Sequence, residues 1–187
     1  MKDLFHGELV SLTGESPDQL AALEMIWQRD TEFHRLADDT PAAMWSEKKN
    51  RELLEKKIGK EEHDYFFFSI RTRDTERLIG VTMLRVDWVN ADAIAGIAIG
   101  EREYWGRGFG TDAMRLLLQY AFLELNLRRV TLSLTADNLR ARKSYEKVGF
   151  VTEGISRSDI LRDGQRFDSV FMGILYEEWR ALMGGSQ

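Results

Sequence analysis

The segment 93–135 constrains the fold more than any other part of the chain. It opens with a strand-like run, Ala93–Gly100, and continues into a loop in which Gly106, Gly108 and Gly110 occupy alternate positions. Apolar residues then recur at helical spacing, and an alternating apolar and polar run closes the segment. A strand, a helix and a second strand in this order form a crossover, which pairs the two strands in parallel. The sequence therefore predicts a parallel strand pair joined through the glycine loop and a helix.

The rest of the chain places further strands and helices around this segment. We expect a first strand over 4–13 and helices over 16–29 and 42–58, because Pro17 and Pro41 lie where these helices start. The elements expected beyond these are strands over 65–72 and 78–86, a helix from Asn138 to Gly149, two strands on either side of Asp163-Gly164, and a helix over 176–182. This order predicts an α+β fold, a mixed, mostly antiparallel sheet of six to seven strands flanked by helices, in a single domain over 1–187.

Composition excludes several classes of function. The net charge of −5 leaves no basic surface for nucleic acid or an anionic membrane. The chain has no cysteine, which excludes disulfides, cysteine-based zinc sites and a thiol nucleophile, and we expect no metal. Neither a signal-peptide pattern nor an apolar run near the roughly 20 residues of a membrane span is found. A cytoplasmic location is therefore expected.

The glycine loop, residues 104–111, predicts an anion site. Alternating glycines let backbone N–H groups converge, and a helix that follows directly adds the positive end of its dipole. A dinucleotide fingerprint would need G-x-G-x-x-G and an acidic residue about 20 residues later, where this chain has Arg128–Val130. An ATP-binding loop would need a lysine where Thr111 follows Gly110. A methyltransferase fits poorly because Glu103 stands about one residue too early, while a plain turn remains an alternative.

A second motif begins at Asn138. It consists of Asn138, Ala141, Tyr145, Gly149 and Phe150 at the spacing Asn-x-x-Ala-x-x-x-Tyr-x-x-x-Gly-Phe. Taken with the glycine loop before it, this pattern resembles the GNAT superfamily of acyl-CoA-dependent N-acetyltransferases. The likeness covers roughly residues 6–180 and is strongest over 78–155.

The glycine loop departs from the general family pattern at one position. Trp105 stands where the family usually has Gln or Arg, as in the branch that acetylates protein N-termini. The chain is most similar to the branch of ribosomal-protein N-terminal and spermidine acetyltransferases. The resemblance implies a domain that binds acetyl-CoA as co-substrate.

The resemblance also assigns residues to the acyl carrier. Backbone N–H groups of the glycine loop would hold the pyrophosphate, and the thioester would lie along the strand before the loop. The residues expected to contact acetyl-CoA are Ile97, Ala98, Ile99, Arg102, Trp105, Gly106, Arg107, Gly108, Phe109, Gly110, Thr111, Asn138, Ala141, Arg142 and Tyr145.

The chemistry needs an acid and a base. By resemblance Tyr145 protonates the leaving thiolate, because a tyrosine with a pKa near 10 keeps its proton at neutral pH. The attacking amine must lose its proton, since only about one alkyl amine in a thousand is neutral at pH 7. Glu101 and Glu103 are the candidate bases, and a base acting through ordered water is an equal alternative. The acceptor pocket is expected to include Glu32, His34, Asp38, Asp39 and Asp87.

The sequence thus predicts an N-acetyltransferase that transfers an acetyl group directly to a primary amine, on a protein N-terminus, a polyamine or another small molecule. A non-catalytic acyl-CoA sensor and, more remotely, an S-adenosylmethionine-dependent methyltransferase are the alternatives. Many members of the family form dimers, and the two terminal strands are consistent with a homodimer.

Overall fold

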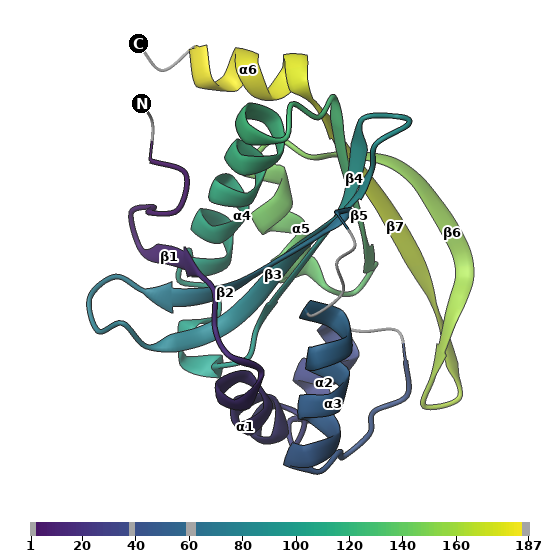
Figure 1. The fold of residues 1–187 in the computed structure, drawn as a ribbon. Helices are drawn as coiled ribbons and strands as arrows, with labels where there is room; N and C mark the ends of the chain where they lie inside the picture. The colour runs from purple at the N-terminus through teal and green to yellow at the C-terminus, as the bar shows by residue number, and fades with distance from the viewer. Residues whose placement is uncertain (1–2, 38–39, 59–62, 185–187) are drawn as a thin grey trace.

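The computed structural model describes residues 3–37, 40–58 and 63–184, which build one seven-stranded sheet flanked by helices (Figure 1). The strand order is β1-β2-β3-β4-β5-β7-β6. β4 and β5 run parallel, and every other neighbouring pair is antiparallel. The predicted mixed, mostly antiparallel sheet is confirmed, and its parallel pair is the one on either side of the glycine loop.

The strands are β1 (Val10–Thr13), β2 (Tyr65–Thr72), β3 (Leu78–Asp87), β4 (Asp92–Ile99), β5 (Arg129–Thr135), β6 (Val151–Arg162) and β7 (Gln165–Leu175). The helices are α1 (Pro17–Trp27), α2 (Thr31–Ala37), α3 (Glu47–Ile58), α4 (Phe109–Gln119), α5 (Leu139–Glu146) and α6 (Tyr176–Gly184). Across the described part of the chain, every helix is too short or too polar to traverse a lipid bilayer.

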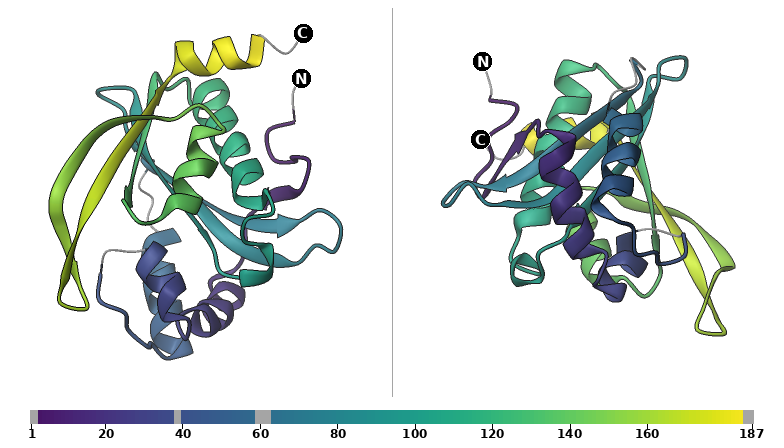
Figure 2. Two further views of the ribbon diagram at one scale, coloured as in Figure 1. Left: turned by 180° about the vertical axis from the view of Figure 1, so that it is seen from behind. Right: turned by 60° about the horizontal axis from the view of Figure 1, so that its bottom comes forward.

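Helices cover both faces of the sheet, α4 and α5 on one and α1 to α3 on the other (Figure 2). The alternation of side chains along β2 explains why. Phe67 packs into the cluster formed with α1 and α3, whereas Phe66 and Phe68 on either side of it pack into the larger core beneath α4. Apolar side chains on both faces of the central strands require a helical layer on each.

The parallel pair separates soon after it forms. β4 and β5 are paired from Asp92 with Arg129 only as far as Ile94 with Thr131. Beyond that point β4 continues along β3 to Ile99, while β5 continues along β7. One backbone edge of residues 95–99 is therefore left without a neighbouring strand.

The first expected strand, 4–13, is wrong in its first part. β1 begins only at Val10, because the buried carboxylate of Asp112 on α4 accepts the N–H groups of Leu9 at 2.7 Å and Val10 at 3.1 Å. These bonds tie the start of β1 to the helix, and just before it the chain folds back, with the N–H of Gly7 donating to the carbonyl of Val10 at 2.8 Å. The interaction joins residues more than a hundred positions apart, so the local pattern does not contain it.

The helices between residues 30 and 58 also differ from the prediction. The helix expected over 42–58 begins only at Glu47, where the Ser46 hydroxyl accepts the N–H of Lys49 at 3.2 Å. The segment before it, which the sequence pattern leaves unassigned, contains α2. Asp30 starts this helix by accepting the N–H groups of Glu32 and Phe33 at 3.1 Å each. The remaining expected strands and helices are confirmed within a few residues.

Gly149, which ends α5, provides a test of the packing around the second motif. Its φ is 103°, and a Cβ there would stand 2.4 Å from Leu182 Cδ1 and 2.9 Å from Ile174 Cδ1. Replacing Gly149 with Ala should lower the free energy of unfolding by about 2–3 kcal/mol, from backbone strain and overpacking together. Urea denaturation measures the change. Gly154→Ala is the matched control, because no atom lies within 4 Å of its added methyl; equal losses in both variants would contradict the prediction.

Candidate active site

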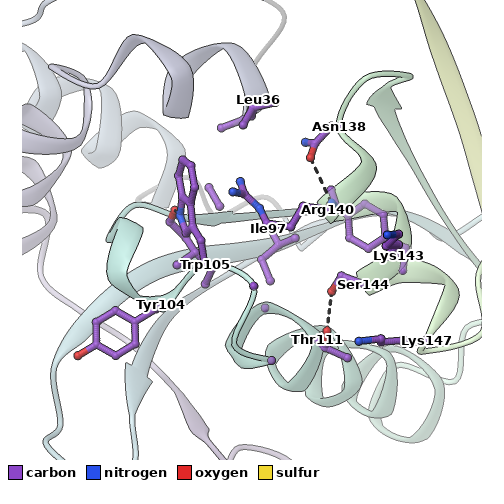
Figure 3. Close-up of a pocket in the computed structure, with 18 of the residues that line it drawn as sticks. Leu36, Ile97, Tyr104, Trp105, Thr111, Asn138, Arg140, Lys143, Ser144 and Lys147 are labelled. Atoms are coloured by element: carbon purple, nitrogen blue, oxygen red, sulfur yellow. Dashed lines mark hydrogen bonds between the residues drawn. The ribbon is translucent and has the colours of Figure 1, made fainter.

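A cavity of about 250 Å³ lies beside the point where β4 and β5 diverge (Figure 3). The end of α2, the end of β4, the glycine loop, the start of α4 and one face of α5 surround it. The residues that line it are Phe33, Leu36, Ala37, Ile97, Ala98, Ile99, Tyr104, Trp105, Gly106, Gly108, Gly110, Thr111, Asn138, Arg140, Ala141, Lys143, Ser144, Tyr145 and Lys147.

The glycine loop borders this cavity with its backbone. Gly106 and Gly108 have φ values of 71° and 96°, which residues with side chains rarely adopt. Gly108 is also the N-cap of α4, and no side chain caps the first turn of that helix. The backbone N–H groups of the first turn of α4, around Gly110 and Thr111, can therefore bind an anion, and the positive end of the helix dipole strengthens this binding.

The free edge of β4 forms another wall. Ile97, Ala98 and Ile99 line the cavity, and this edge has no strand partner beyond Ile94. An extended ligand with amide groups can hydrogen-bond to such an edge as an added strand does. The carbonyl of Ile99 already accepts the Trp105 indole N–H at 2.6 Å, which fixes the indole at the end of the strand.

Trp105 and Arg140 meet across the cavity (Figure 3). The Arg140 guanidinium lies 3.8 Å from the centroid of the Trp105 ring, the geometry of a cation–π contact. Loss of hydration lowers the pKa of Arg140, which nevertheless stays positively charged because an arginine starts so high. This contact connects the glycine loop to the first turn of α5.

Tyr145 lies on α5 and is 8% exposed. Burial of its ring raises the pKa of its hydroxyl to about 12, so the group is protonated throughout the physiological range. Two hydrogen bonds fix the helix that carries it. Asn138 accepts the N–H of Ala141 at 3.1 Å, and the hydroxyls of Thr111 and Ser144 lie 2.7 Å apart.

The second motif, the glycine loop and the divergent strands together form this cavity, and a family comparison agrees with that arrangement. Residues 11–151 match the model of the acetyltransferase (GNAT) domain. The chain belongs to the GNAT acetyltransferase family.

Curated relatives are similar over part of their length. The chain is 35% identical over 99 residues to the putative ribosomal N-acetyltransferase YdaF of Bacillus subtilis, covering 53% of this chain and 54% of that protein. It is 30% identical over 128 residues to the spermidine N(1)-acetyltransferase of Vibrio cholerae, covering 67% and 73%. For YdaF, for the uncharacterized N-acetyltransferase p20 of Bacillus licheniformis and for the probable N-acetyltransferase YjcK of Bacillus subtilis, the match spans between 54% and 64% of the relative's length.

Solved structures share the fold over nearly the whole chain. The spermidine N-acetyltransferase of Vibrio cholerae, solved in complex with CoA and spermine, superimposes with a TM-score of 0.80 at 24% identity. That match covers 91% of this chain and 98% of the other. A probable acetyltransferase gives a TM-score of 0.79 at 26% identity, covering 95% and 98%.

The structure gathers most of the residues that the GNAT resemblance assigned to the carrier. Those that line the cavity are Ile97, Ala98, Ile99, Trp105, Gly106, Gly108, Gly110, Thr111, Asn138, Ala141 and Tyr145. Their placement in one cavity is an observation, and their contacts with acetyl-CoA stay a prediction.

Four residues assigned to the carrier lie outside this lining. Arg102 pairs with Asp30 and, at 2.7 Å, with Glu32. Arg107 donates to the Glu103 carbonyl at 3.0 Å, and Arg142 pairs with Glu146 at 3.0 Å. Phe109 is buried in the core formed with β1.

The two candidate bases also lie outside the cavity lining. Arg77 pairs with Glu101 and with Glu103 at 2.6 Å each. Glu101 further accepts the indole N–H of Trp27 at 2.9 Å. Both carboxylates therefore connect the segment before the glycine loop to Arg77, and Glu101 also connects it to the end of α1. A role as base stays a prediction.

The residues predicted for the acceptor are scattered. Glu32 lines a second cavity beside the first. His34 lines neither cavity, and the Nδ1 atom of His34 is buried without a hydrogen-bond partner among the described residues. Asp87 is the last residue of β3, where hydrogen bonds from Asn90 lower its pKa. Asp38 and Asp39 lie outside the described residues. Within the part of the chain that is described, no cluster of acidic and histidine side chains is suited to a metal ion.

Three cationic residues that line the cavity were not predicted from the sequence: Arg140, Lys143 and Lys147. Their spacing of three and four places them on one face of α5. This spacing was the signal available in the sequence. Assigning Arg142 instead selected a neighbour on the other side of the same helix.

The raised pKa of Tyr145 predicts a pH effect on stability. Between about pH 10 and pH 12 the unfolded chain releases this proton while the folded chain keeps it, so stability falls as the pH rises. The loss approaches about 3 kcal/mol above the window. The variant Tyr145→Phe should not show this loss of stability. The difference in unfolding free energy between wild type and variant should therefore be constant below pH 10, and above pH 10 the wild type should lose stability relative to the variant. Urea denaturation between pH 8 and 11.5 tests this; a difference independent of pH would contradict it.

Proposed function

We propose that the protein is an acetyl-CoA-dependent N-acetyltransferase that transfers the acetyl group directly to a primary amine. The observation that carries the proposal is that one cavity is bordered by a helix N-terminus without a side-chain cap, a free strand edge and the buried residue Tyr145. Membership of the GNAT family and the relatives named N-acetyltransferases support it.

Each wall of the cavity has a task in this proposal. The N–H groups at the start of α4 bind the pyrophosphate, and the free edge of β4 hydrogen-bonds the amides of the pantetheine arm. When bound, acetyl-CoA supplies a thioester carbonyl that a neutral amine can attack. Tyr145 donates its proton to the sulfur as the carbon–sulfur bond breaks. The proton of the amine leaves through water or a base, for which Glu101 and Glu103 remain the proposed candidates.

The second cavity, of about 470 Å³, is the proposed acceptor site. It shares Leu36, Asn138 and Arg140 with the first cavity, so an amine placed there lies beside the acyl group. α2 and the β6–β7 hairpin close it, held together by the pairing of Arg35 with Asp163 at 2.5 Å. The relatives named for spermidine and for ribosomal substrates support a small amine or a protein N-terminus.

Three further points are proposals about the whole protein. We propose that 1–187 acts as one domain, that it works in the cytoplasm, and that it forms a homodimer. β6 is an edge strand whose Val151 and Ile155 are 50% and 58% exposed, which supports pairing with a second copy. Size-exclusion chromatography with light scattering distinguishes a dimer from a monomer.

Binding of acetyl-CoA should raise the melting temperature. A ligand at a hundred times its Kd adds about 2.7 kcal/mol to stability, which corresponds to a shift of roughly 5–10 °C for a chain of this size. Thermal unfolding with acetyl-CoA, CoA or S-adenosylmethionine makes the comparison. A shift with S-adenosylmethionine and none with acetyl-CoA would favour the methyltransferase alternative and refute the proposal.

Tyr145→Phe should separate an enzyme from a sensor. Loss of the proton donor should lower kcat roughly 100-fold with the best acceptor, while the Kd for acetyl-CoA changes less than about threefold. Thiol release with polyamines, amino acids and N-terminal peptides measures turnover. Tyr176→Phe on α6, outside the cavity lining, is the matched control. Absence of turnover in the wild type, together with binding of acetyl-CoA, would instead indicate a non-catalytic sensor.

A further inference from the structure

The cations of the cavity stand in a single row on α5. Arg140, Lys143 and Lys147 all line the cavity, and Figure 3 shows the two lysines beyond Arg140 on the side of Ser144 and Thr111. The row is about 10 Å long at 1.5 Å per residue. It therefore extends well past the Trp105 end of the cavity toward α4.

The two lysines form no ion pair with an acidic residue among the described residues, whereas two of the arginines around the site do. Arg102 pairs with Asp30 and Glu32, and Arg142, on the same helix, pairs with Glu146. The described lining of the first cavity also contains no carboxylate. In a chain with a net charge of −5, this is a locally positive site. Such a surface favours a ligand with several negative charges.

The glycine loop can bind one pyrophosphate but leaves the lysines free. Its N–H groups lie at the start of α4, while Lys143 and Lys147 belong to the last turn and the C-cap of α5. These are two separate elements around one cavity that can bind an anion. A carrier with a pyrophosphate and a further phosphate monoester would satisfy both.

We propose that Lys143 and Lys147 bind the 3′-phosphate on the ribose of CoA, and that they make the protein select CoA over carriers without this group. The inference rests on the proposed function, because it names a determinant of carrier specificity in the same site. The lysine ammonium groups act as charged hydrogen-bond donors to the phosphate oxygens. The glycine loop is left to recognise the pyrophosphate that CoA and 3′-dephospho-CoA share.

The test compares the affinity of two ligands for three forms of the protein. Calorimetry gives the Kd of CoA and of 3′-dephospho-CoA for the wild type, for the double variant Lys143→Ala/Lys147→Ala, and for the control Arg142→Ala. The wild type should bind CoA roughly 30-fold more tightly than 3′-dephospho-CoA, and the control should keep this ratio. The double variant should reduce it to below about threefold, by weakening CoA alone. Raising the salt concentration should shrink the wild-type ratio as well.

Two results would overturn the inference and leave the proposed function standing. One is equal affinity of the wild type for both ligands. The other is a double variant that melts at a lower temperature but keeps the wild-type ratio, because the lysines would then serve only the dipole of α5. Failure of the wild type to bind either ligand would overturn the proposed function together with the inference.

Discussion

The divergence of β4 from β5 is the constraint on which the rest of the site depends. Parallel strands normally pair along their length, but here pairing ends at Ile94 and Thr131. An unpaired edge inside a sheet leaves backbone N–H and C=O groups that need other partners. The indole of Trp105 takes one of these carbonyls, and the cavity gives a ligand access to the edge. α4 and α5 follow the two diverging strands and so bring the glycine loop and Tyr145 to opposite sides of the same opening.

Ion pairs hold the elements around this opening in place. Arg77, just before β3, pairs with Glu101 and Glu103, and Arg102, just before the glycine loop, pairs with Glu32 on α2. Arg35 connects α2 to the β6–β7 hairpin. Most of these groups are partly exposed, so each pair contributes little to stability by itself. Their combined effect is to position the helices and the hairpin that border the two cavities. Carboxylates that look like catalytic candidates in the sequence are occupied in this way.

The distribution of charge differs between the two cavities. The first combines backbone N–H groups with three cations, which suits a phosphorylated carrier. The second has both carboxylates and arginines, which suits an amine acceptor with polar substituents. Arg140 belongs to both, stacked on Trp105 between them. A single arginine thus lies where the carrier and the acceptor would meet.

The sequence by itself determined the order of strands and helices, the parallel crossover and the two motifs, because these depend on local periodicity and on glycines that need positive φ. It also placed Asn138 at the start of a helix that carries Tyr145, and both residues line the cavity. It did not reveal α2, the late start of β1, or the ion pairs of Glu101 and Glu103. Those depend on contacts such as Asp112 with Leu9 and Arg77 with Glu101, which join distant parts of the chain. Only the tertiary structure could decide which of several chemically similar side chains face the cavity, because helical spacing gives the face of a helix but not what lies opposite it.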